Sequence, residues 1–191
     1  MTKIAVIVGS TREGSYNEAL AGLAAARLEA HGAEVTALDL GALDLPIYSD
    51  ALEKEAFPES ALVLKQHLAA QDGVLFVSPE YNGSVPALLK NAIDWASRPT
   101  GDEGLVALTA FRGKAAAIMS ASVSPFGGLR GLLHLRQILN TIQMVVIPEQ
   151  VLVPLAHTGF DEEGQLKEPL PASLVDMTAA RLVKVAAALA A

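Results

Sequence analysis

The stretch KIAVIVGSTREGSYN, residues 3–17, joins a short apolar run to a loop rich in glycine and hydroxyl side chains. Its first part, residues 3–8, is apolar at almost every position, which is typical of a strand buried on both faces of a parallel sheet. A helix candidate at residues 16–31 follows the loop directly. Strand, glycine-rich loop and helix in this order offer free backbone N–H groups and a positive helix end to an anion. The stretch therefore predicts an anion site at the tip of a first strand.

Similar units repeat along the chain. The strand candidates are short and nearly continuous in Val, Ile, Leu and Ala: residues 3–8, 34–39, 73–78, 114–119 and 144–153. Helix candidates alternate with them, at residues 16–31, 58–71, 84–97, 127–141 and 171–190. Five βα units predict a doubly wound α/β fold, and five strands favour the flavodoxin-like order over the Rossmann order. Ligands of such sheets bind beyond the carboxyl ends of the strands, so the loops after strands one, three and four should form the site.

Composition limits the class of function. A chain of 191 residues that is 51% apolar and 18% charged is expected to fold as one globular domain, residues 1–191, with surface excursions at 40–57 and 154–169. The net charge of −7 gives no support to a nucleic-acid or anionic-membrane partner. There is no cysteine, the four histidines are scattered, and neither a membrane span nor a signal peptide is visible. We expect a cytoplasmic protein without a metal site.

The loop at residues 9–17 excludes two common phosphate sites. Thr11 breaks the G-x-G-x-x-G spacing of dinucleotide folds, and Ser15 stands where a Walker loop needs lysine. The remaining donors suit a terminal phosphate monoester: hydroxyls of Ser10, Thr11 and Ser15, the Asn17 amide and the Arg12 guanidinium. A loop that closes on a terminal phosphate would discriminate against FAD. The alternative is a hydroxyl-rich capping loop with a solvated arginine.

Two further loops follow strands three and four. The first, SPEYNGSVPALLKNAIDWAS at residues 78–97, places Tyr81 where it could stack on a flat ring. Backbone donors from Tyr81 to Gly83 could meet the carbonyl edge of that ring. The second, SASVSPFGGLR at residues 120–130, could line its other side. The alternatives are an ordinary exposed tyrosine and a plain βα turn.

GSTREGSYN, PEYNGSVPALLKNAIDWAS and FGG…HLRQIL, in this order and spacing, resemble the NAD(P)H-dependent FMN reductase family. Within it the chain is most similar to the bacterial chromate and quinone reductase branch, over about residues 3–150. The resemblance implies a flavodoxin-like fold, non-covalent FMN, and electron transfer from NADPH or NADH to quinones, chromate, azo compounds or free flavin. It also implies a homodimer or homotetramer with the flavin near a subunit boundary.

Carried over by motif position, the resemblance places the FMN phosphate on Ser10, Arg12, Ser15 and Asn17. The isoalloxazine would lie against residues 79–83. The full set of cofactor-binding residues implied is Ser10, Thr11, Arg12, Glu13, Gly14, Ser15, Tyr16, Asn17, Pro79, Glu80, Tyr81, Asn82, Gly83, Ser120 and Ser122. Ser124 and Pro125 depart from the family pattern, in which glycine is common and proline absent, and this leaves the conformation of the third loop open.

The expected mechanism needs no side-chain acid or base, because a flavin carries the redox chemistry itself. We therefore predict binding residues only, and ping-pong kinetics at one open flavin face. Two other classes stay open: a flavodoxin-type electron carrier without its own NAD(P)H oxidation, and a dehydrogenase without flavin. The helix candidate at 84–97 is apolar on most faces, so it is either deeply buried or at a subunit contact.

Overall fold

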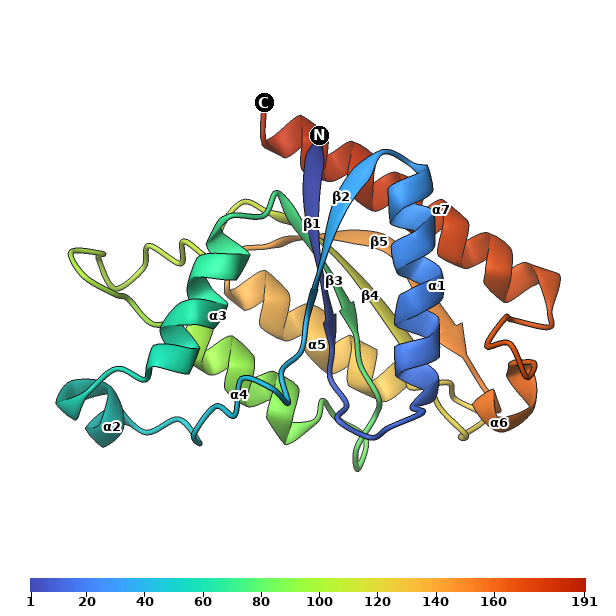
Figure 1. Cartoon of the computed structure of the whole chain (residues 1–191), viewed down its shortest axis with the longest axis horizontal. Coiled ribbons are helices and arrows are strands. Elements are labelled where there is room, and N and C mark those ends of the chain that lie inside the picture. The colour runs from blue at the N-terminus through green and yellow to red at the C-terminus, as the bar shows by residue number, and fades with distance from the viewer.

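The computed structural model describes residues 1–191 and contains one five-stranded parallel sheet in the order β2-β1-β3-β4-β5 (Figure 1). This is the flavodoxin-like order, so the predicted fold class is confirmed. Every predicted strand is present and begins or ends within two residues of its predicted bounds. The strands are β1 (Thr2–Val8), β2 (Ala33–Leu38), β3 (Gly73–Val77), β4 (Ala115–Ala121) and β5 (Val145–Val153).

Helices cover both faces of the sheet (Figure 1). On one face lie α1 (Tyr16–Ala30) and α7 (Pro169–Leu189), and on the other lie α3 (Glu59–Ala69), α4 (Ala87–Ala96) and α5 (Leu129–Thr141). The sequence did not predict two short helices, α2 (Asp50–Glu55) and α6 (Ala156–Gly159), which lie in segments taken as loops. None of the helices combines the length and the apolar character that a membrane crossing requires.

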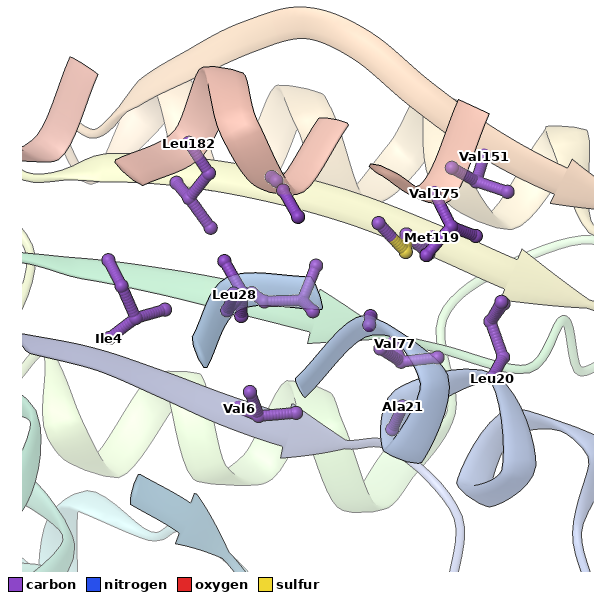
Figure 2. Packing of buried hydrophobic residues seen from close by; sticks show 14 of the residues in the cluster. Ile4, Val6, Leu20, Ala21, Leu28, Val77, Met119, Val151, Val175 and Leu182 are labelled. Carbon is purple, nitrogen blue, oxygen red and sulfur yellow. The ribbon is translucent and has the colours of Figure 1, made fainter. Parts of the chain in front are cut away.

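The near-continuous apolar strands supply two separate cores. Along β1, Ile4 and Val6 face α1 and α7, whereas Ala5 and Ile7 face α3, α4 and α5. Figure 2 shows the first core, in which Leu20 and Leu28 of α1 pack over the sheet beside residues of α7. Because both faces are packed, the carboxyl ends of the central strands are held firmly and so are the loops that leave them.

Helix α4 is covered by its own chain. Trp95 is fully buried, its indole N–H donates to the carbonyl of Pro46 (2.7 Å), and the rings of Tyr48 and Phe57 pack edge-on against it. The amide of Asn91 also bonds to the backbone of this segment. The segment 40–57 is therefore a cover for α4, and deep burial accounts for the apolar faces of this helix.

Candidate functional site

The loops that follow β1, β3 and β4 begin at the same edge of the sheet. The register aligns Val8 with Val77 and Val77 with Met119, at the ends of three adjacent strands. Figure 1 shows the strand arrows of β1 and β3 pointing to the lower edge, where these loops lie. The three loops predicted to form the site are thus brought together by the sheet.

The first loop carries donors that the protein itself does not use. The backbone N–H groups of five residues have no acceptor in the protein: Ser10, Thr11, Glu13, Gly14 and Tyr16. Arg12 is exposed, has no carboxylate partner, and lies over the ring of Tyr16 with its Cζ 5.6 Å from the centroid. Five free N–H groups and an unpaired cation at the N-terminus of a helix are chemically suited to an anion.

Ser15 and Asn17 also serve the structure. Ser15 is the N-cap of α1, and its Oγ accepts from the N–H of Asn17 (3.2 Å). The buried Asn17 amide donates from Nδ2 to the carbonyl of Ala121 and accepts at Oδ1 from the N–H of Ala121, both at 2.9 Å. The structure therefore gives the Asn17 side chain a partner other than the predicted phosphate. It fastens the first loop to the end of β4.

The second loop is a tight turn. Tyr81 and Ser84 exchange two backbone hydrogen bonds of 3.0 Å, and between them Asn82 (φ 51°) and Gly83 (φ 78°) are both left-handed. This is a type I′ turn, for which Asn-Gly is the preferred pair. The N–H groups of Asn82 and Gly83 have no acceptor, whereas that of Tyr81 is used within the turn. Two of the three predicted backbone donors are therefore free, and they lie beside Tyr81, a residue that is 53% exposed.

The Glu80 carboxylate turns inward. It accepts from the N–H of Gly131 (3.1 Å) and forms an ion pair with Arg130, with 5% of the side chain exposed. Burial raises the pKa of Glu80, but the bonds from Gly131 and Arg130 outweigh burial and lower it. His134 on the same helix lies 3.0 Å from the hydroxyl of Ser84. The Glu80 carboxylate thus fastens the second loop to α5 and is not free for a ligand.

The third loop buries one of its serine hydroxyls and uses another within the loop. Ser120 is fully buried beneath Gly128, where an added Cβ would lie 1.9 Å from the Ser120 Oγ, and this Oγ has no hydrogen-bond partner. Ser122 accepts at its Oγ from the N–H of Ser124 (3.2 Å). The structure therefore does not bring Ser120 to the open face of the site, and Ser122 shapes the loop. Pro125 follows a trans peptide bond.

The first loop is bordered by two further segments, which the sequence analysis did not assign to the site. Phe160, from the segment taken as a surface excursion, stacks on Tyr16 at 5.9 Å between centroids. The loop after β2 approaches Thr11 closely, since a Cβ added at Gly41 would lie 2.9 Å from the Thr11 Cγ2. Asp39 shapes this loop by accepting from the N–H groups of Gly41 (2.8 Å) and Ala42 (3.1 Å). The only sequence signal was the position of Asp39 at a strand end.

The residues fit a flavin mononucleotide. The unsatisfied donors of the first loop suit a phosphate dianion, and the free N–H groups of the second loop suit a ring carbonyl. Both loops start at adjacent strands, so one ligand with a phosphate at one end and a ring at the other could contact both.

Known proteins agree with this geometry. Residues 2–158 match the model of the family described as NADPH-dependent FMN reductase. The chain is 41% identical over 165 residues to a 2-hydroxy-1,4-benzoquinone reductase from a Burkholderia species, covering 86% of this chain and 85% of that one. It is 36% identical to an NAD(P)H-dependent FMN reductase of Pseudomonas aeruginosa, with 91% and 89% covered.

Among solved structures, the flavoenzyme NAD(P)H:(acceptor) oxidoreductase FerB of Paracoccus denitrificans is similar with a TM-score of 0.81. It is 30% identical, and the match covers 98% of each chain. The resemblance stated from the three motifs is thereby confirmed, and with it an oxidoreductase that uses FMN and NAD(P)H. This chain belongs to the NADPH-dependent FMN reductase family.

Proposed function

We propose that this protein uses FMN to pass electrons from NAD(P)H to quinones. The observation that carries the proposal is the set of unused donors on adjoining loops. The first loop has five free N–H groups and Arg12, and the second has two free N–H groups beside exposed Tyr81. Relatives named as quinone reductases support the acceptor class.

The protein's part in the reaction is to bind, orient and polarise. FMN, when bound, supplies the exchange of hydride and electrons. Arg12 and the N-terminus of α1 hold the phosphate, which fixes one end of the ligand. The N–H groups of Asn82 and Gly83 can donate to an oxygen that gains charge on reduction, as donors of an oxyanion site do. Because Glu80 is committed to α5, no carboxylate of the second loop opposes that charge.

The acceptor range and kinetics extend this proposal. We expect chromate, azo compounds and free flavin to be reduced at the same site as quinones. One ring face used in turn by donor and acceptor gives ping-pong kinetics, with parallel lines in double-reciprocal plots. Intersecting lines would show a ternary complex.

We also propose that the protein associates with copies of itself. We propose a cytoplasmic location, because NAD(P)H is supplied there. Since α4 is covered within the chain, the support for association is a group of exposed apolar side chains on and near the second and third loops: Tyr81, Val123, Phe126 and Leu133. If a dimer covers these side chains, dilution should dissociate it and lower the specific activity. Light scattering at micromolar concentration tests this, and a fully active monomer would contradict it.

The decisive test of the activity is anaerobic. Protein reconstituted with FMN is mixed with NADPH or NADH, bleaching of the flavin absorbance is recorded, and a benzoquinone is then added. We expect bleaching followed by full recovery with one equivalent of quinone. If NAD(P)H leaves the flavin oxidised while dithionite reduces it, the protein is an electron carrier of the flavodoxin type. A preparation that binds no flavin would leave the dehydrogenase alternative.

A further inference from the structure

The segment after β5, residues 154–167, lies against two loops of the site. In the third loop, the carbonyls of Ser124 and Ser122 accept from the backbone N–H groups of Leu155 (3.3 Å) and Ala156 (3.0 Å). An antiparallel bridge closes the far end of the segment. Its backbone is therefore held in place by the rest of the protein, and it can support a neighbouring loop.

Phe160 brings this segment into contact with the first loop. The residue is 9% exposed, and its ring stacks on the ring of Tyr16, with 5.9 Å between the centroids and 13° between the planes. Tyr16 is the first residue of α1, directly after the N-cap Ser15. The Arg12 Cζ lies 5.6 Å from the centroid of the same tyrosine ring. The Tyr16 ring thus contacts both the segment after β5 and the cation of the first loop.

The Arg12 side chain has few other contacts. It is exposed and forms no hydrogen bond or ion pair within the protein. A free arginine side chain loses rotamer entropy when a ligand orders it. A side chain that already lies over an aromatic ring loses less, so the ring increases affinity by pre-organisation. The position of the Tyr16 ring therefore affects how well Arg12 binds an anion.

We propose that Phe160 is a positioning residue for the anion site of the first loop: it holds the Tyr16 ring where this ring orders Arg12. The inference rests on the proposed flavin function for the identity of the anion, the FMN phosphate. It extends the site beyond residues 2–158, the part of the chain that matches the family model. Phe160 has no polar side-chain group to offer a phosphate, so its effect passes through Tyr16.

Three variants separate this role from ordinary packing. Phe160→Leu removes the ring and keeps an apolar side chain. Phe160→Tyr keeps the ring, and the groove of about 440 Å³ that Phe160 borders has space for the added hydroxyl. The matched control is Phe111→Leu, the same change at a fully buried phenylalanine of the other core. Both leucine variants should lower the free energy of unfolding, so stability does not distinguish them.

The first measurement uses flavin-free protein. NMR relaxation of the arginine Nε–H groups reports how ordered each side chain is on the picosecond to nanosecond timescale. Arg12 should be more mobile in Phe160→Leu than in wild type, Phe160→Tyr or Phe111→Leu. Arg98, whose Nε donates to both carboxylate oxygens of Glu53, is the internal reference and should be equally ordered in all of these proteins. Unchanged order of Arg12 in Phe160→Leu would overturn the inference.

The second measurement is calorimetric titration with FMN and riboflavin. Phe160→Leu should weaken FMN roughly twofold to fivefold, the affinity equivalent of a cation–π contact at an exposed site, and leave riboflavin unchanged. In the Arg12→Ala background the same change should not weaken FMN further, because the group through which it acts is absent. Phe160→Tyr should bind FMN as wild type does. Equal weakening of FMN and riboflavin would mean that the ring only supports the fold.

The two proposals fail separately. If FMN binds more tightly than riboflavin and neither the order of Arg12 nor the affinity for FMN responds to Phe160→Leu, the flavin function stands and the inference is wrong. If Arg12 loses order in Phe160→Leu and FMN does not bind even to wild type, Phe160 positions Arg12 and the proposed function is wrong.

Discussion

Two polar segments of this protein differ in how they use their polar groups. In the segment 98–109 the Glu103 carboxylate is used within the protein: it pairs with the buried Lys65 ammonium, which also donates to the carbonyl of Arg98 (2.6 Å). Glu103 also accepts from the N–H of Thr100 (2.9 Å) and the hydroxyl of Thr109 (2.7 Å). In the loop 9–17, by contrast, the charged side chain of Arg12 has no carboxylate partner in the protein.

The difference separates structure from function. A polar network that is satisfied internally stabilises the fold and has little left to offer a ligand. Donors that stay unpaired at a helix N-terminus retain their binding capacity for an anion. Composition alone does not distinguish the two segments, because both are rich in charged, hydroxyl and glycine residues.

The largest effect is expected from Glu103→Ala. This change leaves the Lys65 ammonium buried without its carboxylate, which should cost about 3–5 kcal/mol of unfolding free energy. FMN affinity should not change, because the segment 98–109 is not part of the site. Urea unfolding measures the first and fluorescence titration the second. The double variant Lys65→Met with Glu103→Leu removes both charges, and its free energy of unfolding should fall much less. An equal loss in both variants would show that the ion pair is not the cause.

Arg12→Ala should have the opposite effect: FMN affinity falls and the free energy of unfolding does not change. Loss of one charge-assisted bond should weaken FMN by about 1.5–3 kcal/mol, roughly tenfold to a hundredfold, with no loss of stability because the side chain is exposed. Titration of the flavin-free protein measures this, with Arg27→Ala at the other end of α1 as the matched control. FMN affinity that falls equally in both variants would mean that general surface charge holds the ligand.

Asn17→Ala should lower both the free energy of unfolding and the affinity for FMN. It leaves the buried N–H and carbonyl of Ala121 without partners and frees the start of α1, at a cost of about 1–3 kcal/mol in stability. FMN affinity should fall as well, because the loop loses its fastening to β4. A variant with native stability and weakened FMN would instead identify the amide as a direct ligand, as the sequence predicted.

The last prediction of this series concerns the pH dependence of stability. Burial raises the pKa of the Glu103 carboxyl, but bonds from Lys65 and Thr109 outweigh burial and lower it from 4.5 to about 2. A lowered pKa stabilises the fold fully above pH 4.5, and this stabilisation is lost as the pH falls from 4.5 through 2. Unfolding measured between pH 6 and 2 should therefore decline less steeply in Glu103→Gln than in wild type. Parallel curves would contradict the assignment.

Sequence patterns predicted what depends on local order. The strands, the main helices and the three loops followed from apolar runs and glycine-rich turns. These patterns could not predict which polar side chains form hydrogen bonds or pack within the protein. Asn17 finds its partner 104 positions away at Ala121, Glu80 finds Gly131, and Ser120 lies under Gly128. These pairings are set by the packing of the whole sheet, and no local pattern encodes them.

The cover over α4 is a second example. The apolar faces of this helix were correctly recognised, but the partner that buries Trp95 is the segment 40–57, which had the composition of a surface loop. Its proline and glycine residues indicated turns, and nothing in its composition indicated that it packs against α4.

The most direct test of the central claim, that the first loop holds a phosphate, compares FMN with riboflavin on flavin-free wild-type protein. The two ligands share the ring and the ribityl chain and differ only in the phosphate. Fluorescence titration should give FMN at least a tenfold to hundredfold advantage, and Arg12→Ala should narrow it. Equal affinities for FMN and riboflavin would contradict the claim and leave the loop as a cap of α1.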